Sequence, residues 1–279
     1  MIAILGSGAV GALIGAELSR AGTEVALVTT ERSVAVLKRD GVTIESPSFG
    51  EHTERMRAVA SLEAPPGVLV VAVKAARLEA ALDRIAGEPE VVVPLLNGVD
   101  HMAVLRSRFP GVIAGTVRVQ AHRDGLKRVI HRAPFLTVSV ADPGAPTLAG
   151  PLRAAGIEVL EGGDEPTVLW AKLTRLAALA LATTAADAPL GDVRAEAEAV
   201  AREVAAVASA EGAAVDADAV VAELRGLPDA ASSSLRADFA AGSRDHELDA
   251  IGGAVLRAAE RNAVAVPRTA ALVAGIGTL

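Results

Sequence analysis

Cysteine and tyrosine are both absent from this chain of 279 residues, and each absence excludes a class of chemistry. Without cysteine, the protein has no disulfide, no thiolate nucleophile and no cysteine-bound zinc. Without tyrosine, it does not belong to the reductases that donate a proton from a tyrosine–lysine pair. A carbonyl reduction would therefore draw its proton from lysine, histidine, aspartic acid or glutamic acid.

Basic residues and long apolar runs are scarce as well. Lysine and arginine number 27 against 34 aspartic and glutamic acids, a net charge of −7, whereas a nucleic-acid-binding face normally makes a domain basic. No basic leader opens the chain, and the longest uncharged apolar stretch, residues 176–186, is shorter than the roughly 18 residues of a membrane span. We therefore expect a cytoplasmic protein that binds neither nucleic acid nor membrane.

Metal-ligand patterns are missing too. Zinc and similar ions need several histidine, cysteine or acidic side chains at characteristic spacings. The histidines show no such spacing, lying at His52, His101, His122, His131 and His246. The sequence therefore predicts no metal site.

Short apolar segments alternate with helical patterns in the first half of the chain. Strands are predicted at residues 1–5, 24–28, 42–45, 68–73 and 91–95, with helices at 12–21, 33–39 and 78–85. The run VLVVAV at 68–73 is typical of a strand buried on both faces. Further strands are predicted at 113–120, 129–131, 136–140 and 158–160, and a helix at 148–155. This alternation predicts a doubly wound parallel sheet of the Rossmann type.

The pattern changes after Gly162-Gly163. Only helical patterns follow, at residues 167–186, 195–210, 217–224 and 248–262. The predicted fold class is therefore α/β, with an N-terminal Rossmann-type doubly wound parallel sheet over residues 1–165. An all-helical C-terminal domain follows over residues 166–279.

A glycine-rich turn follows the first predicted strand and opens the first predicted helix. Its residues match the dinucleotide-binding pattern G-x-G-x-x-G: Gly6, Ser7, Gly8, Ala9, Val10 and Gly11. The three glycines of this pattern permit the tight turn, the close approach of backbone to phosphate, and the packing of helix on strand. Free N–H groups at the helix start then face the pyrophosphate. The alternative is a packing turn in a sheet that binds nothing.

The end of the second predicted strand indicates which nicotinamide cofactor binds. An acidic residue there would bond the ribose 2′-hydroxyl of NAD. This chain has Thr29, Thr30 and Arg32, whose hydroxyl and guanidinium groups suit the 2′-phosphate of NADPH. Glu31 does not suit a phosphate, unless it pairs with Arg32 or points away. The pattern favours NADPH (NADP+), and the alternative is an exposed charge pair at a helix start.

Two polar residues follow buried strands. Lys74 comes directly after residues 68–73, and Asn97, followed by Gly98, comes after residues 91–95. Ligands of open α/β sheets bind at the carboxyl ends of parallel strands. Asn97 could therefore orient the nicotinamide or the substrate. The alternatives are a solvated lysine at a helix start and an ordinary Asn-Gly turn.

Lys172 is the most informative residue of the second half. It interrupts an otherwise apolar helical segment in which Arg175 is the nearest like charge, and a lysine there is costly unless paired or functional. Ser234 precedes a helical stretch, and Glu247 directly precedes the predicted helix at 248–262. From pattern alone, Lys172 could also extend to solvent, and Glu247 could be a simple helix-start charge.

Six short motifs occur in an order and spacing that resemble the ketopantoate reductase (2-dehydropantoate 2-reductase) family. They are GSGAVG at 6–11, VKA at 73–75, LLNG at 95–98, WAKL at 170–173, SSSLRAD at 232–238 and HELDAIGG at 246–253. The resemblance spans nearly the whole chain. It implies an NADP-binding domain over residues 1–165 and a helical substrate-binding, catalytic domain over residues 166–279.

The resemblance also implies an activity and residue roles. The activity is NADPH-dependent reduction of 2-dehydropantoate to pantoate, in pantothenate and coenzyme A biosynthesis. Lys172 is implied as the general acid. Lys74 serves the cofactor with the glycine turn, and Asn97 lies near both nicotinamide and substrate and is implied in catalysis. Ser234 and Glu247 contact the substrate, with Glu247 also implied in catalysis.

Two positions on the helical segment of Lys172 depart from the family pattern. The family helix usually carries asparagines four and eight residues after its lysine, where this chain has Leu176 and Ala180. Another 2-oxo acid or ketone is therefore an alternative substrate. A β-hydroxyacid-type dehydrogenase and a non-catalytic NADPH-binding or regulatory protein are alternative functions. The expected partner is a small-molecule 2-oxo acid, and a homodimer is left open.

Overall fold

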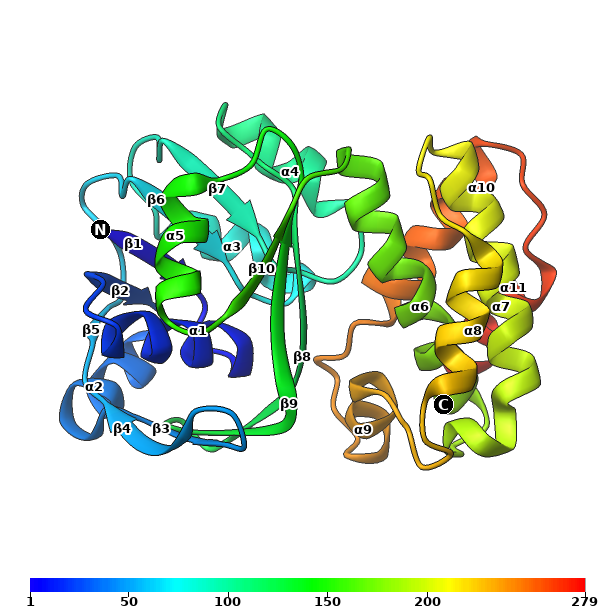
Figure 1. The fold of residues 1–279 in the computed structure, drawn as a ribbon, viewed down its shortest axis with the longest axis horizontal. Helices are drawn as coiled ribbons and strands as arrows, with labels where there is room; N and C mark the ends of the chain where they lie inside the picture. The colour runs from blue at the N-terminus through cyan, green and yellow to red at the C-terminus, as the bar shows by residue number, and fades with distance from the viewer. Residues whose placement is uncertain (279) are drawn as a thin grey trace. The chain divides into compact units, whose positions relative to one another are not determined.

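The computed structural model describes residues 1–278, which form two compact units (Figure 1). One, here called the α/β unit, comprises Met1–Leu96 and His101–Gly163. The other, here called the helical unit, comprises Asn97–Asp100 and the chain from Asp164 onward. The predicted fold class, a parallel sheet with helices followed by a helical region, is confirmed.

The α/β unit is built on a five-stranded parallel sheet in the order β5-β2-β1-β6-β7. Its strands are β1 (Ile2–Leu5), β2 (Val25–Val28), β5 (Arg57–Val59), β6 (Val68–Val71) and β7 (Val91–Pro94). Every residue of β1, β2 and β6 is buried, as unbroken apolar runs predict. The short strand β5 was not predicted, because three residues carry too little pattern.

A second five-stranded sheet in this unit was not anticipated. It has the order β10-β9-β3-β4, with β8 paired to β9. Its strands are β3 (Val42–Ser46), β4 (Gly50–Glu54), β8 (Gly115–Asp124), β9 (Arg128–Val140) and β10 (Glu158–Glu161). Residues 129–131 and 136–140, predicted as two strands, belong to the single strand β9. The pairing of β8 with β9 shifts register between Val119 and Ala121 of β8. Residues 132–135 lie at this shift, and β9 continues through them as one strand.

The helices of the α/β unit are α1 (Ala9–Arg20), α2 (Glu31–Asp40), α3 (Leu78–Leu82), α4 (His101–Arg108) and α5 (Pro146–Ala154), with a short 3₁₀ turn η1 (Ala75–Arg77). Leu13, Ile14 and Leu18 of α1 are fully buried, as their spacing predicts. The helix α4 was missed, because its eight residues, HMAVLRSR, show no clear apolar face.

The helical unit contains α6 (Glu165–Ala185), α7 (Leu190–Ala210), α8 (Ala217–Gly226), α9 (Ser234–Ala240), η2 (Asp249–Gly253), α10 (Ala254–Arg261) and α11 (Pro267–Ile276). The helices predicted at 167–186 and 195–210 are present as α6 and α7, whereas α11 was not predicted. By length and composition α6 could cross a membrane, with mean hydropathy 1.3 over its most apolar window. Since 67% of that window is buried in the protein, its apolar character is that of a core helix.

The predicted helix at 248–262 is divided in two. Its first part, η2, is a π-helical segment, and only the second part, α10, is α-helical. A Cβ atom at Gly252 would lie 2.5 Å from Cγ2 of Val273 in α11, so glycine permits the close packing there. Single π-helical turns inside helices are frequent at functional sites.

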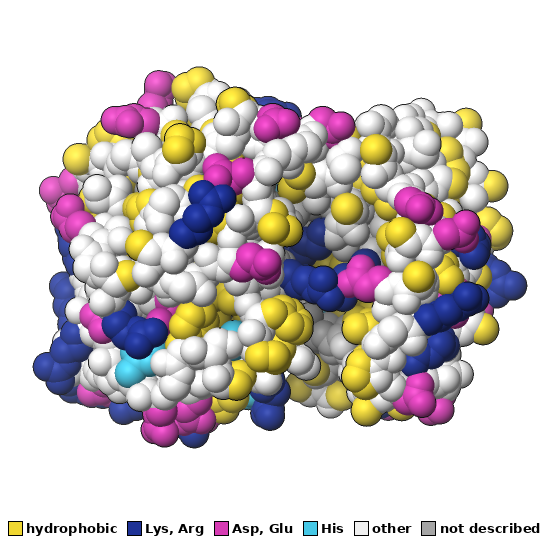
Figure 2. All heavy atoms as spheres, in the orientation of Figure 1, with side chains coloured by type: hydrophobic (Ala, Val, Ile, Leu, Met, Phe, Trp, Pro, Cys, Tyr) yellow, Lys and Arg dark blue, Asp and Glu magenta, His cyan; other side chains and the backbone are white. Residues whose placement is uncertain are grey.

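Charged side chains of both signs are interspersed on the face drawn in Figure 2. No basic surface extends across either unit in that view.

Candidate active site

The glycine turn connects β1 to α1 and requires glycine at its two ends. Gly6 has φ +113°, and a Cβ atom there would lie 2.5 Å from the carbonyl oxygen of Ala72. A Cβ atom at Gly11 would lie 2.1 Å from the carbonyl oxygen of Gly6. The turn, the start of α1 and the segment after β6 are therefore packed backbone to backbone.

The N-terminus of α1 is open to an anion. Gly8 is the N-cap, is exposed, and makes no side-chain capping bond, and the first turn of α1 has no acidic residue. The free backbone N–H groups and the positive end of the helix dipole are thus available. A dinucleotide pyrophosphate matches this chemistry, so the residues present fit the cofactor that the fold implies.

Thr29 and Thr30 directly follow β2, but their side chains make different contacts. Thr29 is buried, and its hydroxyl bonds the hydroxyl of Ser7 in the glycine turn at 2.6 Å. Thr30 is the N-cap of α2, where its Oγ1 accepts from the backbone N–H of Ser33. The Thr29 hydroxyl therefore links the end of β2 to the glycine turn, and the Thr30 hydroxyl caps α2.

Arg32 is the exposed second residue of α2. It has no ion-pair partner among residues 1–278, and it does not pair with the neighbouring Glu31. Its guanidinium is consequently available to an anion near the start of α2, where the helix dipole also favours negative charge.

Lys74 is half-buried and is the N-cap of η1. It follows Ala72, whose carbonyl oxygen lies against Gly6. The lysine predicted to serve the cofactor thus comes two residues after the backbone contact with the glycine turn.

Arg123 was missed by the sequence reasoning. Its guanidinium contacts the carbonyl oxygens of Ser7 and Leu126, and burial lowers its pKa to about 10. It remains a cation at neutral pH, beside the glycine turn. No local signal could reveal it, since 116 residues separate it from Ser7.

In the helical unit, Lys172 lies on α6 among buried apolar neighbours that include Leu169, Trp170 and Leu173. Burial lowers the pKa of Lys172 to about 8, the charge of Glu247 opposes this by raising it, and Arg175 lowers it further. A lysine with such a pKa can be protonated at neutral pH and still release its proton readily.

Asn97 and Glu247 are in direct contact. Nδ2 of Asn97 donates a hydrogen bond to Oε2 of Glu247 at 2.9 Å, across 150 positions of sequence. Both residues are half-buried. Since Glu247 also acts electrostatically on Lys172, the structure brings together the three residues predicted to be catalytic.

Gly98 permits this contact. It has φ +83°, and a Cβ atom there would lie 2.2 Å from the carbonyl oxygen of Ala250 in η2. We expect Gly98→Ala to displace the Asn97 amide from Glu247, because both the backbone angle and the packing exclude a side chain. The expected result is a loss of kcat of about tenfold or more, since small misplacements in an active site have large effects.

Gly212→Ala is the matched control for Gly98→Ala. Gly212 has φ +85° but no atom within 4 Å of its Cβ position, so this variant has the backbone strain without the collision. Steady-state kinetics and thermal melting of both variants separate the two effects. Equal losses in the two variants would show that the approach of Gly98 to Ala250 is unimportant.

The predicted substrate residue Ser234 is the exposed first residue of α9. Its neighbour Ser233 is the N-cap, and the Ser233 hydroxyl bonds that of Thr183 on α6 at 3.0 Å. Leu176, one turn after Lys172 on α6, is half-buried, whereas Ala180 is fully buried in the core. Of the two departures from the family pattern, only Leu176 is accessible in the helical unit.

A Rossmann-type sheet with an open, glycine-rich helix start, followed in the chain by a helical unit with a half-buried lysine near a carboxylate, is typical of a nicotinamide-dependent oxidoreductase. Comparison with known families agrees. The family described as "Ketopantoate reductase PanE/ApbA" matches residues 2–142, and "Ketopantoate reductase PanE/ApbA C terminal" matches residues 167–278. The chain belongs to the ketopantoate reductase family, as its motifs indicate.

The chain is similar over nearly its whole length to proteins of known structure or function. The 2-dehydropantoate 2-reductase of Mycobacterium tuberculosis is 34% identical over 288 residues, which cover 98% of this chain and 95% of the relative. A PanE/ApbA family ketopantoate reductase from Ralstonia eutropha JMP134 has a similar structure, with TM-score 0.88 and 28% identity over 99% of this chain and 97% of that one. D-mandelate dehydrogenase, solved with NADH and anilino(oxo)acetate, also has TM-score 0.88, but its 22% identity shows the fold alone.

These findings confirm that the protein is an oxidoreductase acting on CH–OH and C=O groups. A nicotinamide cofactor follows from the family and from the glycine turn.

Proposed function

We propose that the protein reduces a 2-oxo acid with NADPH, and that its substrate is 2-dehydropantoate, which becomes pantoate on the route to pantothenate and coenzyme A. The mycobacterial relative of that name supports the substrate. The observation that carries the proposal is the group of Lys172, Glu247 and Asn97. We propose that this reaction takes place in the cytoplasm.

Lys172 donates the proton in the proposed reaction. When bound, the nicotinamide supplies the hydride for the carbonyl carbon. The ammonium of Lys172 protonates the oxygen as negative charge develops on it. Because its pKa is about 8, Lys172 gives up the proton more easily than an exposed lysine and regains it from solvent near neutral pH.

Glu247 and Asn97 support Lys172. The negative charge of Glu247 raises the pKa of Lys172 and so opposes the effect of burial. The hydrogen bond from Asn97 fixes the orientation of the Glu247 carboxylate. In this arrangement the second oxygen of Glu247 can accept a hydrogen bond from a substrate hydroxyl, and Ser234 binds a polar end of the substrate.

The cofactor site uses the glycine turn, Lys74 and the start of α2. Arg32 is exposed and unpaired within the described chain, so we assign it to the 2′-phosphate of NADPH. We expect Arg32→Ala to raise the Kd for NADPH by about tenfold, the effect of losing one charged hydrogen bond at an exposed position, and to leave the Kd for NADH unchanged.

Arg39→Ala is the control for Arg32→Ala. Arg39 lies at the other end of α2 and pairs with Asp40, so its loss removes a charge from the same helix without touching the cofactor site. Fluorescence titration with NADPH and NADH measures both variants. A parallel weakening of both cofactors by Arg32→Ala would contradict the assignment.

The substrate is tested with two compounds that differ in one group. Oxidation of NADPH is followed at saturating cofactor with 2-dehydropantoate and with trimethylpyruvate, which lacks only the terminal hydroxyl. A higher kcat/KM for 2-dehydropantoate supports the proposal. A higher value for trimethylpyruvate favours an apolar 2-oxo acid, for which the half-buried Leu176 beside Lys172 is the relevant observation. Binding of NADPH without turnover of either compound would instead indicate a non-catalytic protein.

A further inference from the structure

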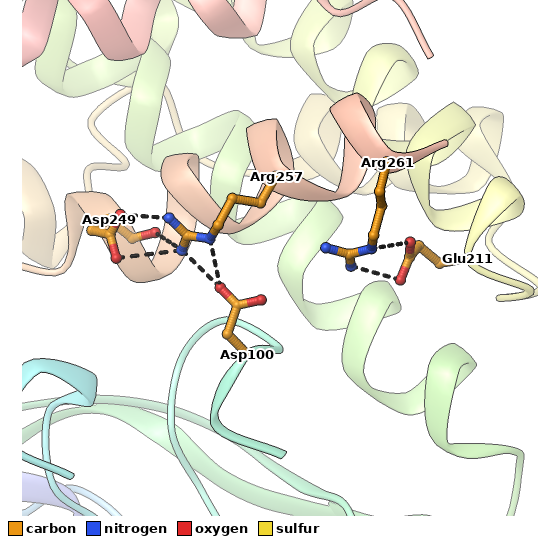
Figure 3. Close-up of polar contacts among 5 residues, drawn as sticks. All are labelled: Asp100, Glu211, Asp249, Arg257 and Arg261. Carbon is orange, nitrogen blue, oxygen red and sulfur yellow. Dashed lines mark hydrogen bonds and ion pairs between the residues drawn. The ribbon is translucent and has the colours of Figure 1, made fainter. Parts of the chain in front are cut away.

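Arg257, on α10, bonds two acidic residues that lie far apart in sequence (Figure 3). Its Nη2 and Nε donate to Oδ2 of Asp100 at 2.7 and 3.1 Å. Its Nη1 donates to Oδ1 of Asp249 at 2.7 Å, and Nη2 reaches the Asp249 carbonyl oxygen at 3.1 Å. One guanidinium thus joins the segment Asn97–Asp100 to the start of η2.

These two segments carry the contact between Asn97 and Glu247. Asp100 comes three residues after Asn97, and Asp249 comes two residues after Glu247. Between them, the backbone at Gly98 lies against Ala250. Three neighbouring contacts therefore hold the two segments together: Asn97 with Glu247, Gly98 with Ala250, and Arg257 with Asp100 and Asp249.

Overall stability does not explain this arrangement. The side chains of Arg257, Asp100 and Asp249 are 45%, 43% and 85% exposed, and exposed ion pairs contribute little to stability. The planar guanidinium is instead suited to fixing two acceptors in a defined geometry, which a lysine cannot do.

A neighbouring arginine provides a comparison. Arg261, one turn further along α10, pairs with both oxygens of Glu211 at 2.9 Å and is 48% exposed (Figure 3). Glu211 also accepts from Nδ2 of Asn262, so this second pair has its own asparagine. Arg261 has the same helix, exposure and partner type as Arg257, but it bonds neither segment of the catalytic group.

We propose that Arg257 is a positioning residue, which acts through Asp100 and Asp249 to hold the Asn97 amide on Glu247. Without Arg257, the segment Asn97–Asp100 loses its attachment at the end distant from Asn97. The amide then spends less time on Glu247, and the carboxylate beside Lys172 is less well oriented. The catalytic consequence rests on the proposed function, but the effect on the Asn97 amide does not.

The composition of the chain permits a direct test. Asn97 and Asn262 are its only asparagines. Labelling with asparagine that carries ¹⁵N in its side-chain amide therefore gives two pairs of signals in a ¹H–¹⁵N spectrum, one pair for each residue, and Asn97→Ala and Asn262→Ala assign them. Each signal reports on one of the two arginine–carboxylate groups.

The variants Arg257→Met and Arg261→Met are compared in the full-length protein. Arg257→Met is expected to shift the Asn97 signal and leave that of Asn262 in place, and Arg261→Met is expected to do the reverse. Arg257→Lys should restore the Asn97 signal only in part, since lysine cannot bond both carboxylates in the same geometry. An unchanged Asn97 signal in Arg257→Met, with thermal melting showing a folded protein, overturns the proposal.

Kinetics tests the consequence for catalysis. Arg257→Met should lower kcat by about tenfold, with the Kd for NADPH unchanged, and should cause no further loss in an Asn97→Ala background, because both changes remove the same contact. Additive losses would overturn the proposal. If the wild-type protein reduces no 2-oxo acid, the proposed function fails, and the NMR comparison still decides whether Arg257 positions Asn97.

Discussion

Replacing Lys172 with methionine is expected to lower kcat for the 2-oxo acid by about 10²–10⁴-fold, the usual contribution of a positioned general acid. The Kd for NADPH should stay unchanged, because the glycine turn and Arg32 belong to the α/β unit. Stopped-flow or steady-state NADPH oxidation gives kcat, and fluorescence titration gives Kd. Equal losses of turnover and cofactor binding would contradict the role assigned to Lys172.

The same variant should not be less stable than the wild type. The pKa of Lys172 is about 8 in the folded protein, against 10.5 for an ordinary lysine side chain in water, so the unfolded chain binds the proton more tightly. Burying this charge therefore opposes folding at neutral pH, and the opposition fades between about pH 8 and 10.5. Methionine removes the cost, so a large loss of activity with an equal or higher melting temperature separates catalysis from folding.

The second large effect is the pH dependence of reduction. Lys172 must be protonated to donate, so log kcat/KM should be level below its pKa of about 8 and fall with a slope of −1 above it. Two charged groups modulate this value in opposite directions, Glu247 by raising the pKa and Arg175 by lowering it. Measurement of kcat/KM between about pH 6 and 10 locates the falling limb.

Two variants with opposite expected shifts test the cause of this limb. Glu247→Gln removes the negative charge, so the limb should move to lower pH and the maximum rate should also fall. Arg175→Met removes the positive charge, so the limb should move to higher pH with little change in the maximum. Shifts in the same direction, or a limb that does not respond to either variant, would mean that another group controls the proton.

Much of the fold could be predicted, because its main signals are local. Buried parallel strands such as β6 are unbroken apolar runs, and α6 is long and apolar enough to be recognised alone. The second sheet was missed because β4 is polar and short, and because β9 passes through a pattern that predicts two strands. Local periodicity does not encode a register shift in the pairing of two strands.

The candidate site was predicted only in part, for a similar reason. Lys172 could be named because it interrupts an apolar helical segment, and Asn97 and Glu247 because they lie in motifs that resemble those of the family. Their contacts depend on residues with no such signal, including Arg257 and Asp100, which are 157 positions apart. The sequence likewise identified the serine-rich segment without showing that Ser233, rather than Ser234, bonds α6. Long-range contacts of single polar residues require the folded structure.

The most direct test of the account is a single-turnover experiment with 2-dehydropantoate and NADPH deuterated at C4 of the nicotinamide, on the face from which hydride is transferred. The wild-type protein should yield pantoate with one deuterium at the carbon that was the ketone, as measured by mass spectrometry. Lys172→Met should form the same product far more slowly, since the proton donor and not the hydride source has been removed. Pantoate without deuterium, or no product from a wild-type protein that binds NADPH, would contradict the account.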